Sequence, residues 1–544
     1  MNRIFLTLTV LILFSFCCST SHAITLIEPL PISFETFSDE ITPIETMSYH
    51  ITSLEVPPSQ IFLLNDSEHA MGHNSILFYL NTVLAGTSFH EINPCIDIDC
   101  YANPYVVYSR STSATVTQSS DIYFQRSLDQ GQTWPNNQLY VWEKPDTTDI
   151  NPTISVFDNG LHAIGTHEVL ENNSYLFLHN YMDLSNPNSW VMTKFDLTPT
   201  VSNVKESTIT TYGDNTIAIS GVVDVSYHEY ELDGTLVIFW SENGTEEQWP
   251  GLFLINQNED GEFYDVSDLS ADSGDFIYVL FLLTDPGIDT SLCIAYCPSD
   301  TLIFEEWNLG IISSGRHTIV NPDIAVDGSN AYVVFQEDRR GSMDIVCFSK
   351  LEGGFWRRSY IALSAENETN PVISAVGDKA ICLYQKSGNL YEVQTDDAGT
   401  SWSQPKQIND VPGSVVVDSN GCDVSGYYGV WVDNRYDNHD ILLSEVGALP
   451  MLRLEDISGG LSLKATVMNY GNAPERDIEW SINITGSLLP KTKTGMIQMI
   501  NPGKSQVVST GMIFGFSDIE IQVKIGELSA DLQGFLSGPF IFIK

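Results

Sequence analysis

The sequence predicts an all-β protein: a seven-bladed β-propeller, with six blades as the alternative, followed by an immunoglobulin-like β-sandwich. Three observations support this fold class. One eight-residue motif occurs twice, a second short motif opens strands at four places, and helical periodicity is nearly absent along the 544 residues. A chain of this length exceeds the size at which one core stops growing, so a large repeat fold or several domains are expected.

Residues 1–23 are expected to be a secretory signal peptide. The chain begins Met-Asn-Arg, continues with the apolar run from Ile4 to Phe16, and has Ser21 and Ala23 just before the expected cut. A positive start, an apolar centre and small residues before cleavage are typical of such peptides. No later apolar run reaches the roughly 18 residues that span a bilayer. We therefore expect a secreted protein, extracellular or at the cell surface, without a membrane span. Residues 24–82 are expected to form an irregular lead-in.

The first repeated motif has the form [Ser/Thr]-x-Asp-x-Gly-x-[Ser/Thr]-Trp. Its members are Ser127, Asp129, Gly131, Thr133 and Trp134 in the first copy and Thr395, Asp397, Gly399, Ser401 and Trp402 in the second. Glycine adopts the positive φ of a tight turn, and aspartate accepts hydrogen bonds from turn amides. Tryptophan supplies a large plate for packing. All of these roles are structural.

The second motif, Asn-Pro-x-Ile, starts at residues 93, 151, 321 and 370 and opens a short strand each time. Further apolar strands such as 105–109 and 331–336 follow it, with turn residues between them. Units of about 40 to 50 residues with four strands each are blades of a propeller. We assign residues 83–446 to this fold. The last unit lacks a fourth strand, and residues 83–90 are expected to supply it and close the ring.

The sequence pattern changes after residue 450. Residues 451–544 show short alternating strands separated by turn residues, in fewer than 100 residues. This length and pattern suit an immunoglobulin-like sandwich.

The eight-residue motif resembles the Asp-box, or bacterial neuraminidase repeat, of the sialidase superfamily. The resemblance covers about residues 84 to 446, and the tail resembles Ig-like modules of secreted surface proteins. In sialidase-like propellers the Asp-box lies on the face opposite the active site. The resemblance therefore implies a fold, and it places any chemistry at the other rim of the ring.

Arginines gather at that other rim in a chain with few basic residues. The candidate ligand-binding residues are Arg110, Arg316, Arg339, Arg340 and Arg435. The resemblance implies that three arginines would hold a substrate carboxylate, since guanidinium groups bind carboxylates bidentately. It also implies a tyrosine nucleophile with a glutamate, and an aspartate as acid/base.

Two features of the sequence oppose an enzyme. No arginine lies between Arg3 and Arg110, and the family's Arg-Ile-Pro motif is absent near the first blade. In the alternative interpretation, each arginine pairs with acids of its own or the adjacent blade. No catalytic residue is assigned.

The formal charge of −46, from 24 basic and 70 acidic side chains, excludes general nucleic-acid binding. No cofactor is expected and no metal ligands are assigned, although residues 97–103 and 433–440 carry oxygen ligands at spacings that suit calcium. Seven cysteines follow the signal peptide, and Cys95 with Cys100 is the first disulfide to test.

Three functions remain open. The preferred one is an exported, non-catalytic propeller whose rim binds a glycan, a peptide or a surface polymer. The second is an exo-sialidase-type glycoside hydrolase that acts on acidic sugars, and the third is a structural cell-surface protein. The sequence does not give the oligomeric state.

Overall fold

The structure is a computed structural model that describes residues 34–40 and most of 81–544. The gaps in the second range are 112–119, 136–138, 143–146, 158–159, 170–173, 185–188, 197–200, 213–215, 228–229, 242–250, 255–264, 285–289, 300–306, 316, 352–353, 419, 437, 487–490 and 527. The predicted signal peptide, most of the lead-in and Arg316 therefore lie outside the described residues. All regular structure within the described residues is β-strand, and none of it is a helix that could span a bilayer.

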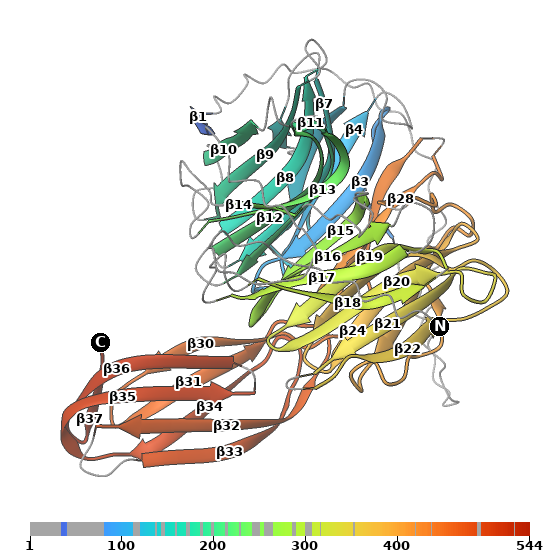
Figure 1. The fold of residues 1–544 in the computed structure, drawn as a ribbon. Coiled ribbons are helices and arrows are strands. Elements are labelled where there is room, and N and C mark those ends of the chain that lie inside the picture. Colours follow the sequence, from blue (N-terminus) through green and yellow to red (C-terminus); the bar gives the residue numbers. More distant parts are fainter. Residues whose placement is uncertain are drawn as a thin grey trace, which may run out of the picture.

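The described residues between 82 and 445 form seven antiparallel sheets, numbered here in chain order (Figure 1). Sheet 1 contains β3 (His90–Ile98), β4 (Pro104–Ser111), β5 (Ser120–Arg126) and β6 (Leu139–Trp142), and sheet 2 contains β7 (Thr147–Phe157), β8 (Gly160–Val169), β9 (Ser174–Asp183) and β10 (Ser189–Asp196). Sheet 3 contains β11 (Val201–Tyr212), β12 (Thr216–Tyr227), β13 (Tyr230–Ser241) and β14 (Gly251–Leu254), and sheet 4 contains β15 (Asp265–Ser273), β16 (Phe276–Thr284), β17 (Thr290–Pro298) and β18 (Asn308–Gly315).

Sheet 5 contains β19 (Ile319–Asp327), β20 (Asn330–Glu337), β21 (Asp344–Lys350) and β22 (Arg357–Ala362), and sheet 6 contains β23 (Thr369–Val376), β24 (Lys379–Lys386), β25 (Asn389–Thr395) and β26 (Lys406–Gln407). Sheet 7 contains β27 (Cys422–Ser425), β28 (Tyr428–Asp433), β29 (Asp440–Glu445) and β2 (Thr82–Ala85). One strand appears where the sequence predicted irregular chain. β1 (Phe34–Glu40) adds a fifth strand to sheet 2 by pairing with the edge strand β10.

The seven sheets close into a ring. The first strand of each sheet contacts the first strand of the next, from β3 through β7, β11, β15, β19 and β23 to β27, and β27 contacts β3 again. The chain also closes the ring by strand pairing, because β2 pairs with β29 although they are far apart in sequence, with Thr82 opposite Leu443. This pairing confirms the expected donation of a strand from the segment before the first repeat. Radial packing of small antiparallel sheets is the arrangement of a β-propeller.

Apolar side chains hold neighbouring sheets face to face. One buried cluster joins sheets 6 and 7, with Ile381 and Leu383 on one side and Trp431 and Leu442 on the other. Similar clusters join sheets 7 and 1, 1 and 2, 3 and 4, 4 and 5, and 5 and 6. Middle strands such as β28 are buried on both faces, which explains why they are nearly continuous apolar runs.

The Asn-Pro motif forms a β-bulge at the start of the inner strands. Asn93, Asn151, Asn321 and Asn370 have φ between 51° and 53°, and the strand register shifts beside each of them. Asparagine tolerates this left-handed conformation better than most residues, and proline fits a bulge because it has no N–H to donate. The asparagine side chains also join sheets: Asn93 Nδ2 lies 2.8 Å from Asn151 Oδ1, and Asn321 Nδ2 lies 2.6 Å from Asn370 Oδ1.

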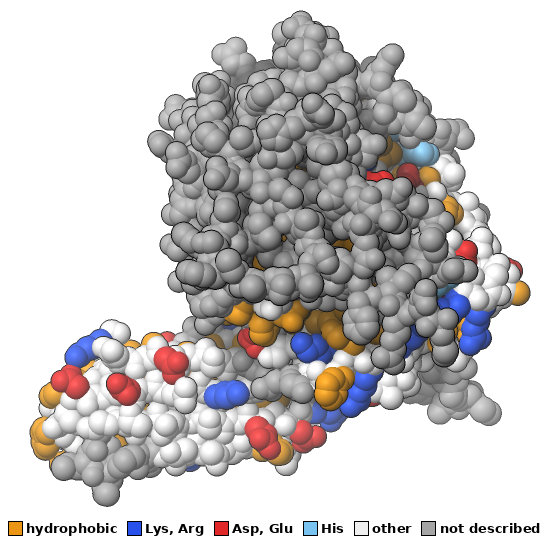
Figure 2. All heavy atoms as spheres, in the orientation of Figure 1, with side chains coloured by type: hydrophobic (Ala, Val, Ile, Leu, Met, Phe, Trp, Pro, Cys, Tyr) orange, Lys and Arg blue, Asp and Glu red, His pale blue; other side chains and the backbone are white. Residues whose placement is uncertain are grey.

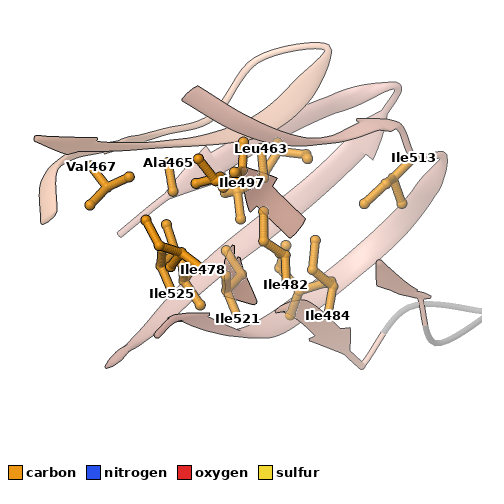
Figure 3. Packing of buried hydrophobic residues seen from close by; sticks show 14 of the residues in the cluster. Leu463, Ala465, Val467, Ile478, Ile482, Ile484, Ile497, Ile513, Ile521 and Ile525 are labelled. Carbon is orange, nitrogen blue, oxygen red and sulfur yellow. The ribbon is translucent and has the colours of Figure 1, made fainter. Parts of the chain in front are cut away.

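Residues 452–543 form two facing sheets. The strands are β30 (Leu452–Ser458), β31 (Ser462–Asn469) and β34 (Ser505–Met512) in one sheet, and β33 (Lys491–Ile500), β32 (Glu475–Thr485), β35 (Gly515–Ile525), β36 (Leu528–Gly538) and β37 (Phe540–Ile543) in the other. Isoleucine, leucine and valine side chains from both sheets meet between them (Figure 3). On β35 buried and exposed side chains alternate almost without interruption, as expected for a sheet with one face on a core.

This C-terminal sandwich contacts the ring beside the first copy of the eight-residue motif. The rings of Tyr101 and Tyr470 meet edge to face with centroids 5.4 Å apart, and the Arg453 guanidinium lies 4.0 Å from the centroid of the Tyr101 ring. Lys379 Nζ of the ring lies 2.9 Å from Glu475 Oε2 of the sandwich. The sandwich extends away from the ring, and on its visible face charged side chains are scattered singly (Figures 1 and 2).

Candidate functional site

The rim formed by the loops between second and third strands carries four of the five arginines that the sequence singled out: Arg110, Arg339, Arg340 and Arg435. Arg110 lies at the end of β4 in sheet 1. Its Nε is 3.0 Å from Glu91 Oε1, and its guanidinium lies 3.9 Å from the centroid of the Tyr123 ring. The Arg110 side chain is 11% exposed, while the Glu91 side chain is fully buried. Arg110 therefore neutralises an acid of its own sheet.

Arg339 and Arg340 lie in the hairpin loop between β20 and β21 of sheet 5. Arg339 Nε is 3.6 Å from Glu337 Oε2, and Arg339 Nη2 is 3.1 Å from His317 Nε2. Arg340 lies over the Tyr360 ring, 5.0 Å from its centroid. Arg358 on β22, which the sequence did not single out, also pairs with Glu337. The buried Glu337 thus pairs with both Arg339 and Arg358 and lies at the centre of this cluster.

Arg435 follows β28 in sheet 7 and makes the most complete ion pair of the set. Its Nε and Nη2 donate to the two carboxylate oxygens of Asp433 at 2.8 and 2.9 Å, and its Nη1 lies 2.6 Å from Asp410 Oδ1. The Arg435 side chain is 8% exposed. Burial acts to raise the pKa of Asp433, but hydrogen bonds from Arg435 and Ser414 outweigh it and hold that pKa below its usual value.

These arginines do not share one carboxylate. Arg110 pairs with Glu91, Arg339 with Glu337 and Arg435 with Asp433 and Asp410, so each is held by acids near its own sheet. Since Arg316 lies outside the described residues, the structure does not place it.

A cavity of about 480 Å³ lies at the centre of the ring, lined by the first strands of all seven sheets. Its described wall contains no Lys, Arg or His and carries six acids: Asp97, Glu206, Asp268, Asp272, Asp323 and Asp423. Each carboxylate accepts a main-chain N–H from the next sheet of the ring. The shortest of these contacts, 2.7 Å, join Asp97 Oδ2 to Val156 N and Asp272 Oδ2 to Val326 N. Among the described residues, the acids thus link the inner strands of sheets 1 and 2, 3 and 4, 4 and 5, 5 and 6, and 7 and 1.

Burial dominates the electrostatics of the cavity. It raises the pKa of Asp97 to about 6, of Glu206 and Asp423 to about 7, and of Asp272 to about 8, although main-chain hydrogen bonds act in the opposite direction. These side chains have some surface on the cavity but are surrounded by protein, so few water molecules solvate their charge. Part of the ring of acids is therefore protonated near neutral pH.

The two copies of the eight-residue motif adopt the same turn. Asp129 Oδ1 accepts Thr133 N at 2.8 Å, and Asp397 Oδ1 accepts Ser401 N at 2.8 Å. The hydroxyls of Ser127 and Thr395 accept the N–H groups of Gly131 and Gly399, whose φ values are 76° and 74°. The copies differ in the tryptophan. Trp134 Nε1 donates to Gly131 O of its own turn, whereas Trp402 Nε1 donates to Ser359 Oγ of the preceding sheet.

The cysteines and histidines give no metal centre among the described residues. No group of three or more His, Cys, Asp or Glu side chains there is arranged to hold a metal ion. Cys95 and Cys100 are not joined by a disulfide, contrary to the pairing proposed for testing. Cys95 lines the central cavity, whereas Cys100 lies in the turn beyond β3 with its sulfur near Arg453. Burial lowers the pKa of His179 to about 3, and this neutral ring lies beside His162.

Comparison with known proteins gives no family for the chain. No family model matches the sequence, and no curated protein matches it. Among solved structures, a protein of unknown function from Dyadobacter fermentans is similar with 11% identity and a TM-score of 0.41, over 68% of this chain and 98% of its own. A Trypanosoma rangeli sialidase in complex with 2,3-difluorosialic acid has 11% identity and a TM-score of 0.39, over 86% and 92%.

A phage phi92 endosialidase is similar with 12% identity and a TM-score of 0.39, over 70% of each chain. Because these TM-scores lie below 0.5, the fold rests on the strand order and contacts of this chain.

Proposed function

We propose that the chain is an exported, non-catalytic propeller of the sialidase-like type, with seven blades and an Ig-like module, whose rim binds a glycan, a peptide or a surface polymer. One observation carries the proposal. Three of the arginines that would hold a substrate carboxylate, Arg110, Arg339 and Arg435, already pair with protein carboxylates, and the Arg435 and Arg110 side chains are 8% and 11% exposed. A guanidinium that donates to Asp433 at two atoms and to Asp410 at a third has little capacity left for a ligand.

Two exposed aromatic side chains at the same rim favour binding. Phe89 precedes β3 and is 43% exposed, and Tyr436 lies between β28 and β29 and is 60% exposed. Asn438 Nδ2 donates to Phe89 O at 2.7 Å, which ties the two loops together. Aromatic faces with a few polar groups nearby are common in ligand sites. We assign the contact surface to these two loops.

The first experiment tests for catalysis. Hydrolysis of a chromogenic sialoside and melting temperature are measured for the parent and for Arg339→Ala, Arg340→Ala and Arg435→Ala. We expect no turnover by the parent. We expect Arg435→Ala to lower stability by about 3 kcal/mol, because it leaves Asp433 buried and unpaired. Turnover by the parent that disappears in the arginine variants, with melting unchanged, would establish the exo-sialidase function instead.

The second experiment tests for binding. Immobilised glycans and cell-surface polymers are probed with the parent, with Phe89→Ala and Tyr436→Ala, and with a matched control, Phe355→Ala, whose side chain is 91% exposed between β21 and β22. The two rim variants should lose binding while melting like the parent, and the control should bind normally. If no polymer binds, or if the rim variants bind as well as the parent, the rim is not the contact surface and a structural cell-surface role becomes the better description.

A further inference from the structure

At the arginine rim, two interfaces between neighbouring sheets contain the same arrangement of buried acids. In each, an aspartate begins the third strand of one sheet and a glutamate lies at the entrance to the next sheet. The first pair is Asp344 of sheet 5 with Glu368, the residue before β23 of sheet 6. The second is Asp440 of sheet 7 with Glu91 of sheet 1. Main-chain bonds set both pairs side by side: Glu368 N donates to Met343 O at 2.9 Å, and Glu91 N donates to His439 O at 2.8 Å.

The two glutamates are held in the same way. Glu368 Oε1 accepts Lys386 Nζ at 2.9 Å and the hydroxyl of Ser364. Glu91 Oε1 accepts Arg110 Nε at 3.0 Å and the hydroxyl of Thr87. In both pairs the second carboxylate oxygen, Oε2, has no hydrogen-bond partner among the described residues. One cation and one hydroxyl thus fix each glutamate and leave one of its oxygens uncommitted.

The aspartates are buried, and three of their four carboxylate oxygens have no hydrogen-bond partner among the described residues, while Asp440 also has a hydrogen bond with the Asn438 side chain. Asp344 is fully buried, and neither of its carboxylate oxygens has a hydrogen-bond partner within the described part of the chain. Asp440 is 2% exposed, and its Oδ1 likewise has none. A buried polar atom without a partner requires an explanation, such as a bound ion, because leaving it unpaired costs about 1 to 3 kcal/mol, and more if it is charged.

The charges around the aspartates are mostly negative. Glu368, Glu337 and Arg340 face Asp344; Glu91, Asp433 and Arg435 face Asp440. Burial and the neighbouring acids raise the pKa of both aspartates, that of Asp440 to about 6. Within the described residues, neither aspartate forms an ion pair. A positive charge between each aspartate and glutamate would remove the repulsion and complete the coordination of the free oxygens.

We propose that each pair, Asp344 with Glu368 and Asp440 with Glu91, binds one calcium ion that joins two neighbouring sheets of the ring. Calcium takes six to eight oxygen ligands, which include carboxylates, main-chain carbonyls and water, so two carboxylates from facing sheets are enough to anchor it. The ion suits these positions because every uncommitted atom is an oxygen and because the chain carries a net charge of −46. A shared proton between the two carboxyls is the competing explanation, and the experiment separates the two.

The experiment uses the full chain after treatment with EDTA. Melting temperature is measured with calcium, with magnesium and with sodium at equal ionic strength, and calcium binding is titrated by calorimetry. The parent should bind two equivalents of calcium and melt at a higher temperature in its presence. Asp344→Asn and Asp440→Asn should each lose one equivalent, and the double variant should show no calcium-dependent rise in melting temperature. Asp531→Asn, an exposed acid on the sandwich, is the matched control and should behave like the parent.

Two results would overturn the proposal. If the parent binds no calcium in the titration, the sites do not exist, and this holds even if a variant fails to fold. If instead the double variant keeps the full response to calcium, the ion binds elsewhere. If calcium does not change the melting temperature of the parent, and the Asp344→Asn variant melts at or above the parent's temperature, the two carboxyls share a proton. Sialoside hydrolysis and glycan binding are measured separately, so failure here leaves the proposed function untouched.

Discussion

Aspartates accept main-chain N–H groups at two places in this protein, and their pKa values are lowered at one place and raised at the other. At the outer turns, Asp129 and Asp397 accept a main-chain N–H and two hydroxyls, and these hydrogen bonds lower both pKa values, that of Asp397 to about 2. Around the central cavity, Asp97 and Asp272 also accept main-chain N–H groups, yet burial raises their pKa values to about 6 and about 8.

The difference shows which effect decides the charge of an aspartate. Hydrogen bonds to a carboxylate favour its charged form, and they prevail at the turns because water still solvates the group. In the cavity the same bonds are outweighed by the loss of that water. The turn aspartates therefore stabilise one short loop as anions. The cavity aspartates connect neighbouring sheets and carry a proton over part of the neutral range.

The tryptophans should give the largest effect. Both rings are half-buried and pack against core clusters, so Trp402→Ala and Trp134→Ala should each cost about 3 kcal/mol of unfolding free energy. The loss should be greater for Trp402, because its indole N–H bonds a residue of the preceding sheet and that of Trp134 bonds its own turn. Urea unfolding measures both. A loss below about 1 kcal/mol for both would show that the tryptophans do not hold the sheets together.

Removal of a cavity carboxyl should cause the second-largest loss of stability. Asp272→Ala leaves Val326 N and Ser273 N without their acceptor, which should cost about 2 kcal/mol. Asp397→Ala leaves turn amides that water can reach, so its effect on unfolding should be the smaller of the two. If the turn variant loses more stability than the cavity variant in urea unfolding, the comparison between the two regions is wrong.

The glycine of the outer turn should show a smaller effect. Gly399 has a φ of 74°, and a Cβ there would lie 3.1 Å from Ser349 Oγ. Gly399→Ala should cost about 1 to 2 kcal/mol from backbone strain, plus a contribution from this close contact. Gly377 has a φ of 59° with open space around its Cβ position, so Gly377→Ala carries the strain alone and is the matched control. Equal losses in thermal unfolding would show that the contact with the preceding sheet is unimportant.

Sequence reasoning succeeded where information is local or repeated. The repeats predicted the four-stranded units, and the missing strand of the last unit predicted the pairing of β2 with β29. Ion pairing of rim arginines with nearby acids, one of the two interpretations of the sequence, agrees with the contacts of Arg110, Arg339 and Arg435, whereas a ligand-binding role for these arginines stays a prediction. Asn-Pro stands out in the sequence as a repeated motif, but its positive φ and its asparagine contacts between sheets became evident only in the fold. The tolerance of asparagine for this conformation was a usable signal.

Partners on other strands and on other sheets could not be predicted. Arg358 of β22 reaches Glu337 of β20 only because both strands pair with β21 in sheet 5, and Glu368 faces Asp344 only because two sheets meet there. The contact between His162 and His179 also depends on the pairing of β8 with β9. β1 escaped notice because its sequence has no repeat to identify it, and its partner is an edge strand far along the chain.

The most direct test of the role of the cavity acids is the pH dependence of unfolding for the parent and for Asp272→Asn. The folded pKa of Asp272 is raised from 3.8 to about 8, so the folded state binds a proton that the unfolded state releases. Its stabilising contribution is complete below about pH 4 and is lost as the pH rises toward about 8. The unfolding free energy of the variant, measured against that of the parent, should therefore increase across this range, whereas Asp397→Asn should show a constant difference. A difference for Asp272→Asn that stays constant, or that decreases as the pH rises, would contradict this role.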